Sequence, residues 1–99
     1  MQPTFTAPQG GSAAILKCPA CGSEYLHQVR VEIFERGEDA PGGLHVTVEN
    51  GRAITDTELK GNPSVRRDGL RIHFECEGCP AKPVLSFSQH KGNTEVSFD

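Results

Sequence analysis

The sequence predicts an all-β domain made of antiparallel strands, and three observations carry the prediction. Apolar and polar residues alternate along several segments, which is the two-residue period of a half-buried strand. Turn-forming pairs, of which Asn50-Gly51 is the strongest, separate these segments. Two Cys-x-x-Cys motifs each follow a strand-like run, Ala13 to Lys17 before the first and Leu70 to Phe74 before the second. The chain therefore reads as short strands joined by tight turns.

The length and composition indicate one small domain with a modest core. The chain has 99 residues, of which 35% are hydrophobic and 6% aromatic, and it contains no Trp. Burial of so little apolar surface gives a thin margin against chain entropy. Residues 1–12, rich in Pro and Gly, are expected to form a flexible N-terminal segment. The single domain is expected to span residues 13–99 and to be stabilised by a metal ion.

The charge and hydropathy pattern excludes some classes of protein. The formal net charge of −3 argues against a protein that holds nucleic acid by general phosphate neutralisation. No stretch approaches the roughly 20 apolar residues of a membrane span, and the N-terminus lacks a signal-peptide pattern. We expect a cytoplasmic protein, in which paired cysteines are metal ligands or redox groups more often than disulfides.

The first half of the predicted domain contains a long strand and a hairpin. From residue 24 to 36, one face of the strand is largely apolar and the other is polar. A second strand follows from Leu44 to Val48, and Asn50-Gly51 turns the chain into a return strand ending near Thr55. We expect the apolar face to be buried and the polar face to meet water. The expected apolar face holds Tyr25, His27, Val29, Val31 and Ile33, and the polar face holds Gln28, Arg30 and Glu32.

The second half begins with a polar loop over about 55–69, too polar to be core. A long irregular loop inside a compact domain is often functional. Leu70, Ile72 and Phe74 then alternate with polar residues up to Cys76. A closing hairpin is predicted from Leu85 to Phe98, with its turn at Lys91-Gly92-Asn93.

All four cysteines lie in two motifs, Cys18-Pro19-Ala20-Cys21 and Cys76-Glu77-Gly78-Cys79. A Cys-x-x-Cys turn places two thiolates at about the separation of a tetrahedral edge, with Zn–S bonds of roughly 2.3 Å. Two such turns complete the coordination shell, so one structural Zn²⁺ per chain is predicted, with iron as the other metal that fits. Gly22 follows the first motif, where this turn commonly needs a positive φ. The alternative is a thiol redox protein that uses either pair.

These motifs resemble those of the zinc ribbon superfamily: a strand, a Cys-Pro-x-Cys-Gly knuckle, a strand, then a second Cys-x-x-Cys knuckle and a terminal hairpin. The match covers residues 15–31 and 70–98. It looks especially like small uncharacterised zinc-ribbon proteins of bacteria and their phages, with a β-rich insertion between the knuckles. The resemblance implies a four-cysteine zinc site and an antiparallel zinc-ribbon sheet with an inserted β-hairpin at about 25–55. The 54 residues at positions 22–75 are more than a compact ribbon needs.

Other candidate residues are weaker signals. The four histidines are not expected to be catalytic: His45 and His73 should face solvent and His27 should be partly buried, while Glu32, Glu35, Glu38 and Asp39 should form a solvated surface. The one basic cluster is Lys60, Arg66, Arg67 and Arg71. We expect a non-enzymatic protein-interaction module that binds a protein partner through sheet edges or the polar loop. The alternative is nucleic-acid binding through the basic cluster.

Overall fold

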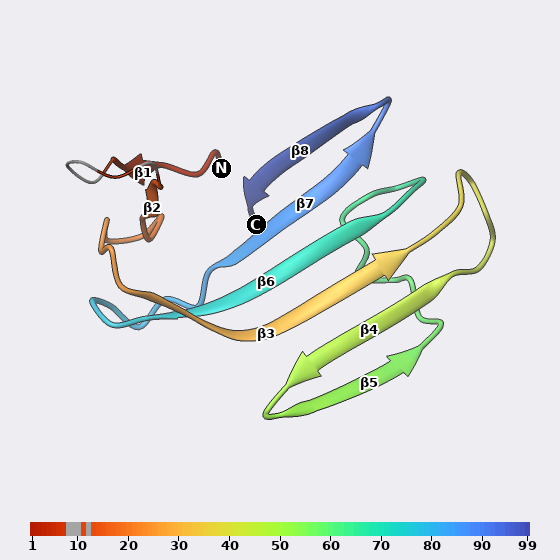
Figure 1. Ribbon diagram of the computed structural model, residues 1–99, viewed down its shortest axis with the longest axis horizontal. Helices are drawn as coiled ribbons and strands as arrows, with labels where there is room; N and C mark the ends of the chain where they lie inside the picture. Colours follow the sequence, from red (N-terminus) through yellow and green to blue (C-terminus); the bar gives the residue numbers. More distant parts are fainter. Residues whose placement is uncertain (8–10, 12) are drawn as a thin grey trace.

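The computed structural model describes residues 1–7, 11 and 13–99, and within them every regular element is a strand. The long strands form one antiparallel sheet of order β5-β4-β3-β6-β7-β8 (Figure 1). A separate two-stranded sheet pairs β1 (Phe5–Thr6) with β2 (Ile15–Leu16). The predicted all-β class is confirmed. The strands of the large sheet are β3 (Leu26–Glu35), β4 (Leu44–Glu49), β5 (Arg52–Asp56), β6 (Gly69–Cys76), β7 (Val84–His90) and β8 (Asn93–Phe98).

The two tight hairpins form where the sequence predicts them. Asn50 and Gly51 have φ values of 52° and 73°, and Lys91 and Gly92 have φ values of 49° and 83°. Two consecutive positive φ angles define the hairpin turn whose twist matches that of the flanking strands. These turns join β4 to β5 and β7 to β8.

Pairing of β3 with β6 unites the two halves of the chain. The register runs from Leu26 opposite Cys76 to Phe34 opposite Gly69, with a β-bulge between Gln28 and Arg30. Because β3 also pairs with β4, the inserted strands extend the sheet that carries the second knuckle. The insertion and the C-terminal strands are thus one structure.

The N-terminal segment contributes backbone pairing of its own. β1 lies within the stretch expected to be flexible, and it pairs with β2 just before the first knuckle. Met1 exchanges backbone hydrogen bonds of 3.0 and 2.7 Å with Phe98 at the end of β8. Residues 8–10 and 12, part of the same expected segment, lie outside the described residues.

The sheet has two chemically distinct faces, because directly opposed residues on neighbouring strands share a face. We call one the apolar face; on β3 and β4 it holds Val31, Ile33, Val46 and Val48, and on β6, β7 and β8 it holds Leu70, Ile72, Leu85, Phe87, Val96 and Phe98. The opposite, polar face holds Glu32, Phe34, His45, Arg71 and His73.

The loop over residues 57–68 covers the polar face, and in Figure 1 it passes behind the sheet. A Cβ built on Gly61 would lie 3.5 Å from Cζ of Phe34 and 3.9 Å from Oε2 of Glu32. Phe34 is 1% exposed and Ser64 of the loop is also buried. The polar loop therefore closes the most buried part of the sheet.

This arrangement corrects the expected orientation of several polar side chains. Glu32 and His45, expected to meet water, are buried at 6% and 8% exposure, and His73 is only partly exposed. His27, expected to be partly buried, is exposed. Glu32, His45 and His73 are covered because the loop packs on the polar face. The β-bulge between Gln28 and Arg30 moves His27 out of the phase of Val31 and Ile33. Tyr25 and Val29, also expected to be buried, are exposed. Ile33 and Val48 on the apolar face remain substantially exposed instead.

Candidate metal centre

The first knuckle follows β2 and turns the chain toward β3. The N–H of Cys18 donates to the carbonyl of Ser23 at 2.8 Å, and the N–H of Gly22 donates to the carbonyl of Cys18 at 2.9 Å. Gly22 has a φ of 78°, as the sequence predicts, because this left-handed conformation costs glycine little. The turn thereby places the sulfurs of Cys18 and Cys21 on the same side.

The second knuckle continues directly from β6. The N–H of Gly78 donates to Sγ of Cys76 at 3.3 Å, and the N–H of Glu77 donates to the carbonyl of Tyr25 at 3.0 Å. A Cβ on Gly78 would lie 3.0 Å from Cβ of Ser23 and 3.3 Å from Sγ of Cys21. The glycine allows the two knuckles to approach this closely.

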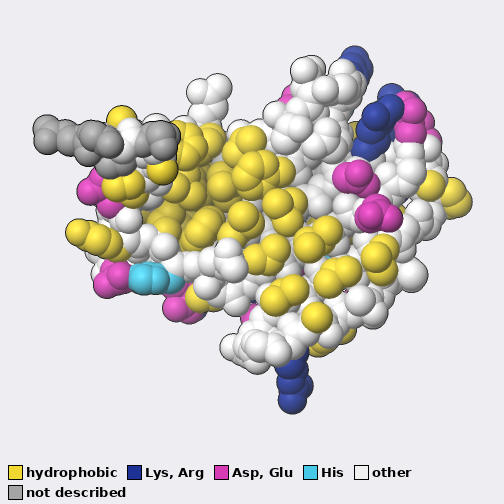
Figure 2. Space-filling model, in the orientation of Figure 1, with side chains coloured by type: hydrophobic (Ala, Val, Ile, Leu, Met, Phe, Trp, Pro, Cys, Tyr) yellow, Lys and Arg dark blue, Asp and Glu magenta, His cyan; other side chains and the backbone are white. Residues whose placement is uncertain are grey.

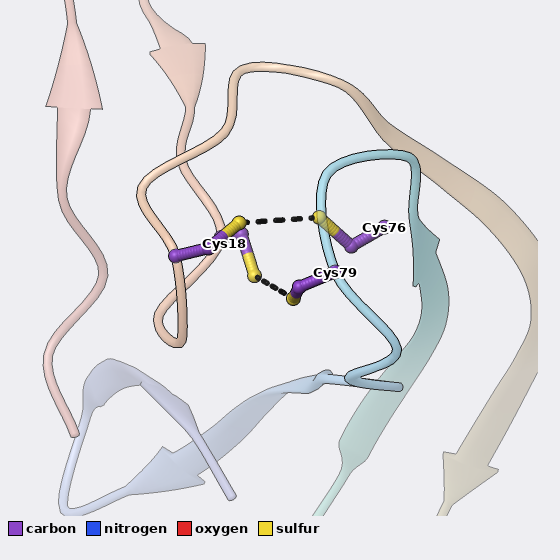
Figure 3. A group of neighbouring side chains, drawn as sticks. Cys18, Cys76 and Cys79 are labelled. Atoms are coloured by element: carbon purple, nitrogen blue, oxygen red, sulfur yellow. Dashed lines mark hydrogen bonds between the residues drawn. The ribbon is translucent and has the colours of Figure 1, made fainter.

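The knuckles bring all four cysteine sulfurs within 4.8 Å of one another. Sγ of Cys18 lies 3.8 Å from Sγ of Cys79, and Sγ of Cys21 lies 3.6 Å from Sγ of Cys76. A tetrahedron with metal–sulfur bonds of roughly 2.3 Å has edges of about 3.8 Å. In Figure 3 the labelled side chains of Cys18, Cys76 and Cys79 point into the space between the knuckles. These distances fit one metal ion held by four sulfurs.

The chemistry of the thiols also fits a cation at the centre. Burial raises the pKa of Cys76, but the Gly78 N–H and the neighbouring sulfurs outweigh it, and the pKa falls to about 7. The Ala81 N–H lowers the pKa of Cys79, but burial and the three other sulfurs raise it to about 12. Once one thiolate forms, its negative charge therefore opposes the deprotonation of the neighbouring thiols. A bound divalent ion removes this repulsion and deprotonates its thiol ligands.

The surroundings of the site are uneven. Cys18 is 2% exposed, Cys76 and Cys79 are half-buried, and Cys21 is exposed. A hydrogen bond between the His27 ring on β3 and the Glu77 carboxylate in the second knuckle lies next to the site. It links the start of β3 to the knuckle, on the exposed side of the metal centre.

Comparison of the chain with protein-family models, curated proteins and solved structures gives no match. The geometry of the site therefore carries the functional argument alone. No helix among residues 1–7, 11 and 13–99 is long and apolar enough to cross a membrane.

The structure does not bring the predicted basic cluster together as one cationic surface. Arg66 forms a two-pronged ion pair with Asp39, at 2.8 and 2.7 Å, and Arg67 pairs with Glu38 at 2.8 Å. Arg71 lies on the polar face of β6 and pairs with Asp99. Lys60 lies in the loop over residues 57–68, where its N–H bonds the Glu58 carboxylate. Acidic side chains thus neutralise the three arginines locally.

Sequence reasoning missed the buried polar cluster on β3, β4 and β6. Oε2 of Glu32 lies 2.9 Å from Nε2 of His45, and Oε1 lies 2.7 Å from Nε2 of His73. His45 also stacks on Phe34, with ring centroids 4.4 Å apart. The available signal was Phe34, because an aromatic residue two positions after Glu32 places that carboxylate on a face that something must cover.

Proposed function

We propose that this protein is a small non-enzymatic domain in which one structural zinc ion holds two knuckles together and presents a protein-binding surface. The single observation that carries the metal proposal is the cluster of four sulfurs. They come from motifs more than 50 residues apart, with sulfur contacts between knuckles that span 61 and 55 positions. Four thiolates with tetrahedral spacing are a ligand set that Zn²⁺ prefers.

A structural role follows from the ligand count. Catalytic zinc keeps a coordination position for water or substrate, whereas a four-thiolate site fills every position. The described residues bury only five apolar side chains, those of Cys18, Phe34, Pro83, Leu85 and Phe98. A metal that links the knuckles would supply stability that so small a core lacks. The thiolate site also supports the proposed cytoplasmic location, where cysteines stay reduced.

The surface chemistry supports a protein partner over nucleic acid. Arg66, Arg67 and Arg71 already pair with acidic side chains, so phosphate binding would have to break those ion pairs. Proteins that bind nucleic acid usually present clustered, available cations. The apolar face of the sheet differs: its central rows carry no charge, and Ile33 and Val48 there are substantially exposed. Such a face favours another protein surface.

The test is elemental analysis of protein purified without added metal, together with thiol titration before and after denaturation in chelator. One zinc per chain with four masked thiols is the expected result. One iron per chain would overturn the zinc assignment. Free thiols or disulfides without metal would overturn the structural site and make the redox protein the better interpretation.

A further inference from the structure

The apolar face is uncharged across its central rows. One row of directly opposed residues contains Thr55, Val46, Ile33, Leu70, Phe87 and Val96. The adjacent row contains Ala53, Val48, Val31, Ile72, Leu85 and Phe98. Neither row holds a charged side chain. Figure 2 shows hydrophobic side chains gathered over β3, β4, β6 and β7 on this side.

The part of this face on β3, β4 and β5 is the most open to solvent, whereas Leu85 and Phe98 on β7 and β8 are buried. Ile33 is 44% exposed and Val48 is 43% exposed, although β3 and β4 each have a neighbouring strand on both sides. Ile33, Leu70 and Phe87 line a shallow hollow in the same face, and the acidic residues Glu35 and Asp68 also line it. Central sheet positions of a two-layer domain are normally covered by the second layer. Here the loop over residues 57–68 supplies a cover for the polar face alone.

The size of the exposed surface matches what a dimer interface would remove. The accessible surface is 6518 Å², whereas a compact monomer of 10.7 kDa exposes about 5,500 Å². The excess is about 1,000 Å² per chain, and a standard interface buries about 800 Å² per partner. The radius of gyration, 14.8 Å, likewise exceeds the roughly 12.6 Å of a compact chain of this length.

We propose that a second copy of this chain covers the apolar face, so that two sheets pack face to face as a symmetric β-sandwich dimer. In a twofold interface each partner presents the same patch, and an uncharged apolar patch meets its own copy without like-charge repulsion. Two sheets packed in this way lie about 10 Å apart and complete the second layer. The inference rests on the proposed protein-binding role and names the partner.

The interface lies far from the metal centre along the sheet. Leu26, opposite Cys76, is at the knuckle end of β3, and Ile33 is seven positions further along the strand. At about 3.3 Å per residue this is roughly 23 Å. A substitution at Ile33 can therefore change association while the knuckles stay assembled.

The experiment is sedimentation equilibrium of the metal-loaded full chain over a range of micromolar concentrations. Wild type is expected to sediment as a dimer. Ile33→Glu is expected to weaken dimerisation by about 100-fold or more, because the twofold axis places the unpaired carboxylate in the interface twice. Val48→Glu, on the neighbouring strand, should act in the same direction.

The matched control is Ile54→Glu, which makes the same exchange at a residue 58% exposed on β5. Ile54 opposes Thr47, which opposes Glu32, so it lies on the polar face. This variant should remain a dimer. Metal content and thiol masking, read on the same samples, show that each variant is folded.

A metal-loaded wild type that is monomeric throughout would overturn the proposal, and so would a dimer that both Ile33→Glu and Val48→Glu leave intact. A monomer that binds an unrelated protein through this face would also overturn it, since the partner would then be a different chain. The two proposals fail separately. A metal-loaded monomer overturns only the dimer, and a metal-free dimer overturns only the structural metal site.

Discussion

The carboxylate of Glu32 lies 2.9 Å from Nε2 of His45, and both side chains are buried beneath the loop over residues 57–68. The other ring nitrogen of His45 lies 2.9 Å from Oδ1 of Asp56. His73 lies 2.7 Å from the other carboxylate oxygen, Oε1, and a guanidinium nitrogen of Arg71 lies 3.9 Å from the same atom. A guanidinium nitrogen of Arg30 lies 3.6 Å from Oε2. One buried carboxylate thus contacts side chains on β3, β4 and β6.

Glu32→Gln should lower the free energy of unfolding by about 3 kcal/mol, because it removes the buried charge that its partners face. The amide keeps the shape of the side chain, so the decrease in unfolding free energy reflects the lost charge and its hydrogen bonds. Urea unfolding of the metal-loaded protein measures this decrease. Glu49→Gln, exposed on β4 and outside the apolar face, should change stability by less than about 0.5 kcal/mol. Equal effects at both positions would contradict a special role for Glu32.

The contribution of Glu32 should depend on pH. Burial raises its pKa, but hydrogen bonds from His73 and His45 and the charge of Arg30 outweigh it, so the pKa lies below its usual 4.5. A depressed folded pKa gives stability that is present above pH 4.5 and is lost as pH falls through the folded value. The stability difference between wild type and Glu32→Gln should therefore be full at neutral pH and shrink in acid. A difference that stays constant below pH 4.5 would refute the shift.

Gly78→Ala should weaken metal retention. The added Cβ would lie 3.0 Å from Cβ of Ser23 and 3.3 Å from Sγ of Cys21, so the second knuckle must move away from the first. In competition with a chromogenic chelator, this variant should lose its metal faster and at a lower chelator concentration than wild type. Gly42→Ala is the control, because its Cβ would meet nothing within 4 Å. Retention equal to that of the control would show that the knuckles tolerate a wider separation.

Gly69→Ala should displace the loop from the polar face. Its Cβ would lie 2.1 Å from Oδ1 of Asn62 and 2.7 Å from Cδ of Pro63. Asn62 cannot turn aside freely, because Oδ1 accepts the N–H of Ser64 at 3.0 Å. We expect a loss of about 1–3 kcal/mol and faster proteolysis within residues 57–68. In Gly37→Ala the Cβ would make an ordinary 3.7 Å contact, and cleavage should stay at the wild-type rate.

Cys76→Ser should leave the chain largely unfolded, because the proposed zinc site would contribute folding free energy that the small core cannot replace. Circular dichroism of the variant should match that of wild type in excess chelator. A cooperative, native-like thermal transition in the variant would show that the six-stranded sheet is stable without a complete site.

The parts of the structure that depend on local chemistry were predictable from the sequence. Asn50-Gly51 and Lys91-Gly92 mark their hairpins because few other pairs adopt two positive φ angles in succession. The Cys-x-x-Cys spacing likewise indicated the sulfur cluster, because the turn itself sets the distance between its two thiols.

Which face of the sheet is covered was not predictable in the same way. Alternation along β3 shows which residues share a face, but it does not show which face is covered. The segment that covers Glu32 and Phe34 is a polar loop that starts more than 20 residues later. Its approach depends on Gly61 and Gly69, which leave room against the sheet. β1 has only two residues, too few for any periodic signal. Long-range packing decided these features, and one sequence does not display it.

The pairing of β3 with β6 has a consequence for how the chain folds. It joins residues as far apart as Leu26 and Cys76, and closing a loop of about 50 residues costs roughly 3.5 kcal/mol of chain entropy before any strand pair forms. Sheets built on such distant pairings fold slowly. A slip of one position would also exchange the two faces. A metal ion bound by both knuckles would close this loop and fix the register of β3 against β6 at the same time. Zinc binding would then precede the pairing of the strands, which would start at the knuckle end of β3 and β6.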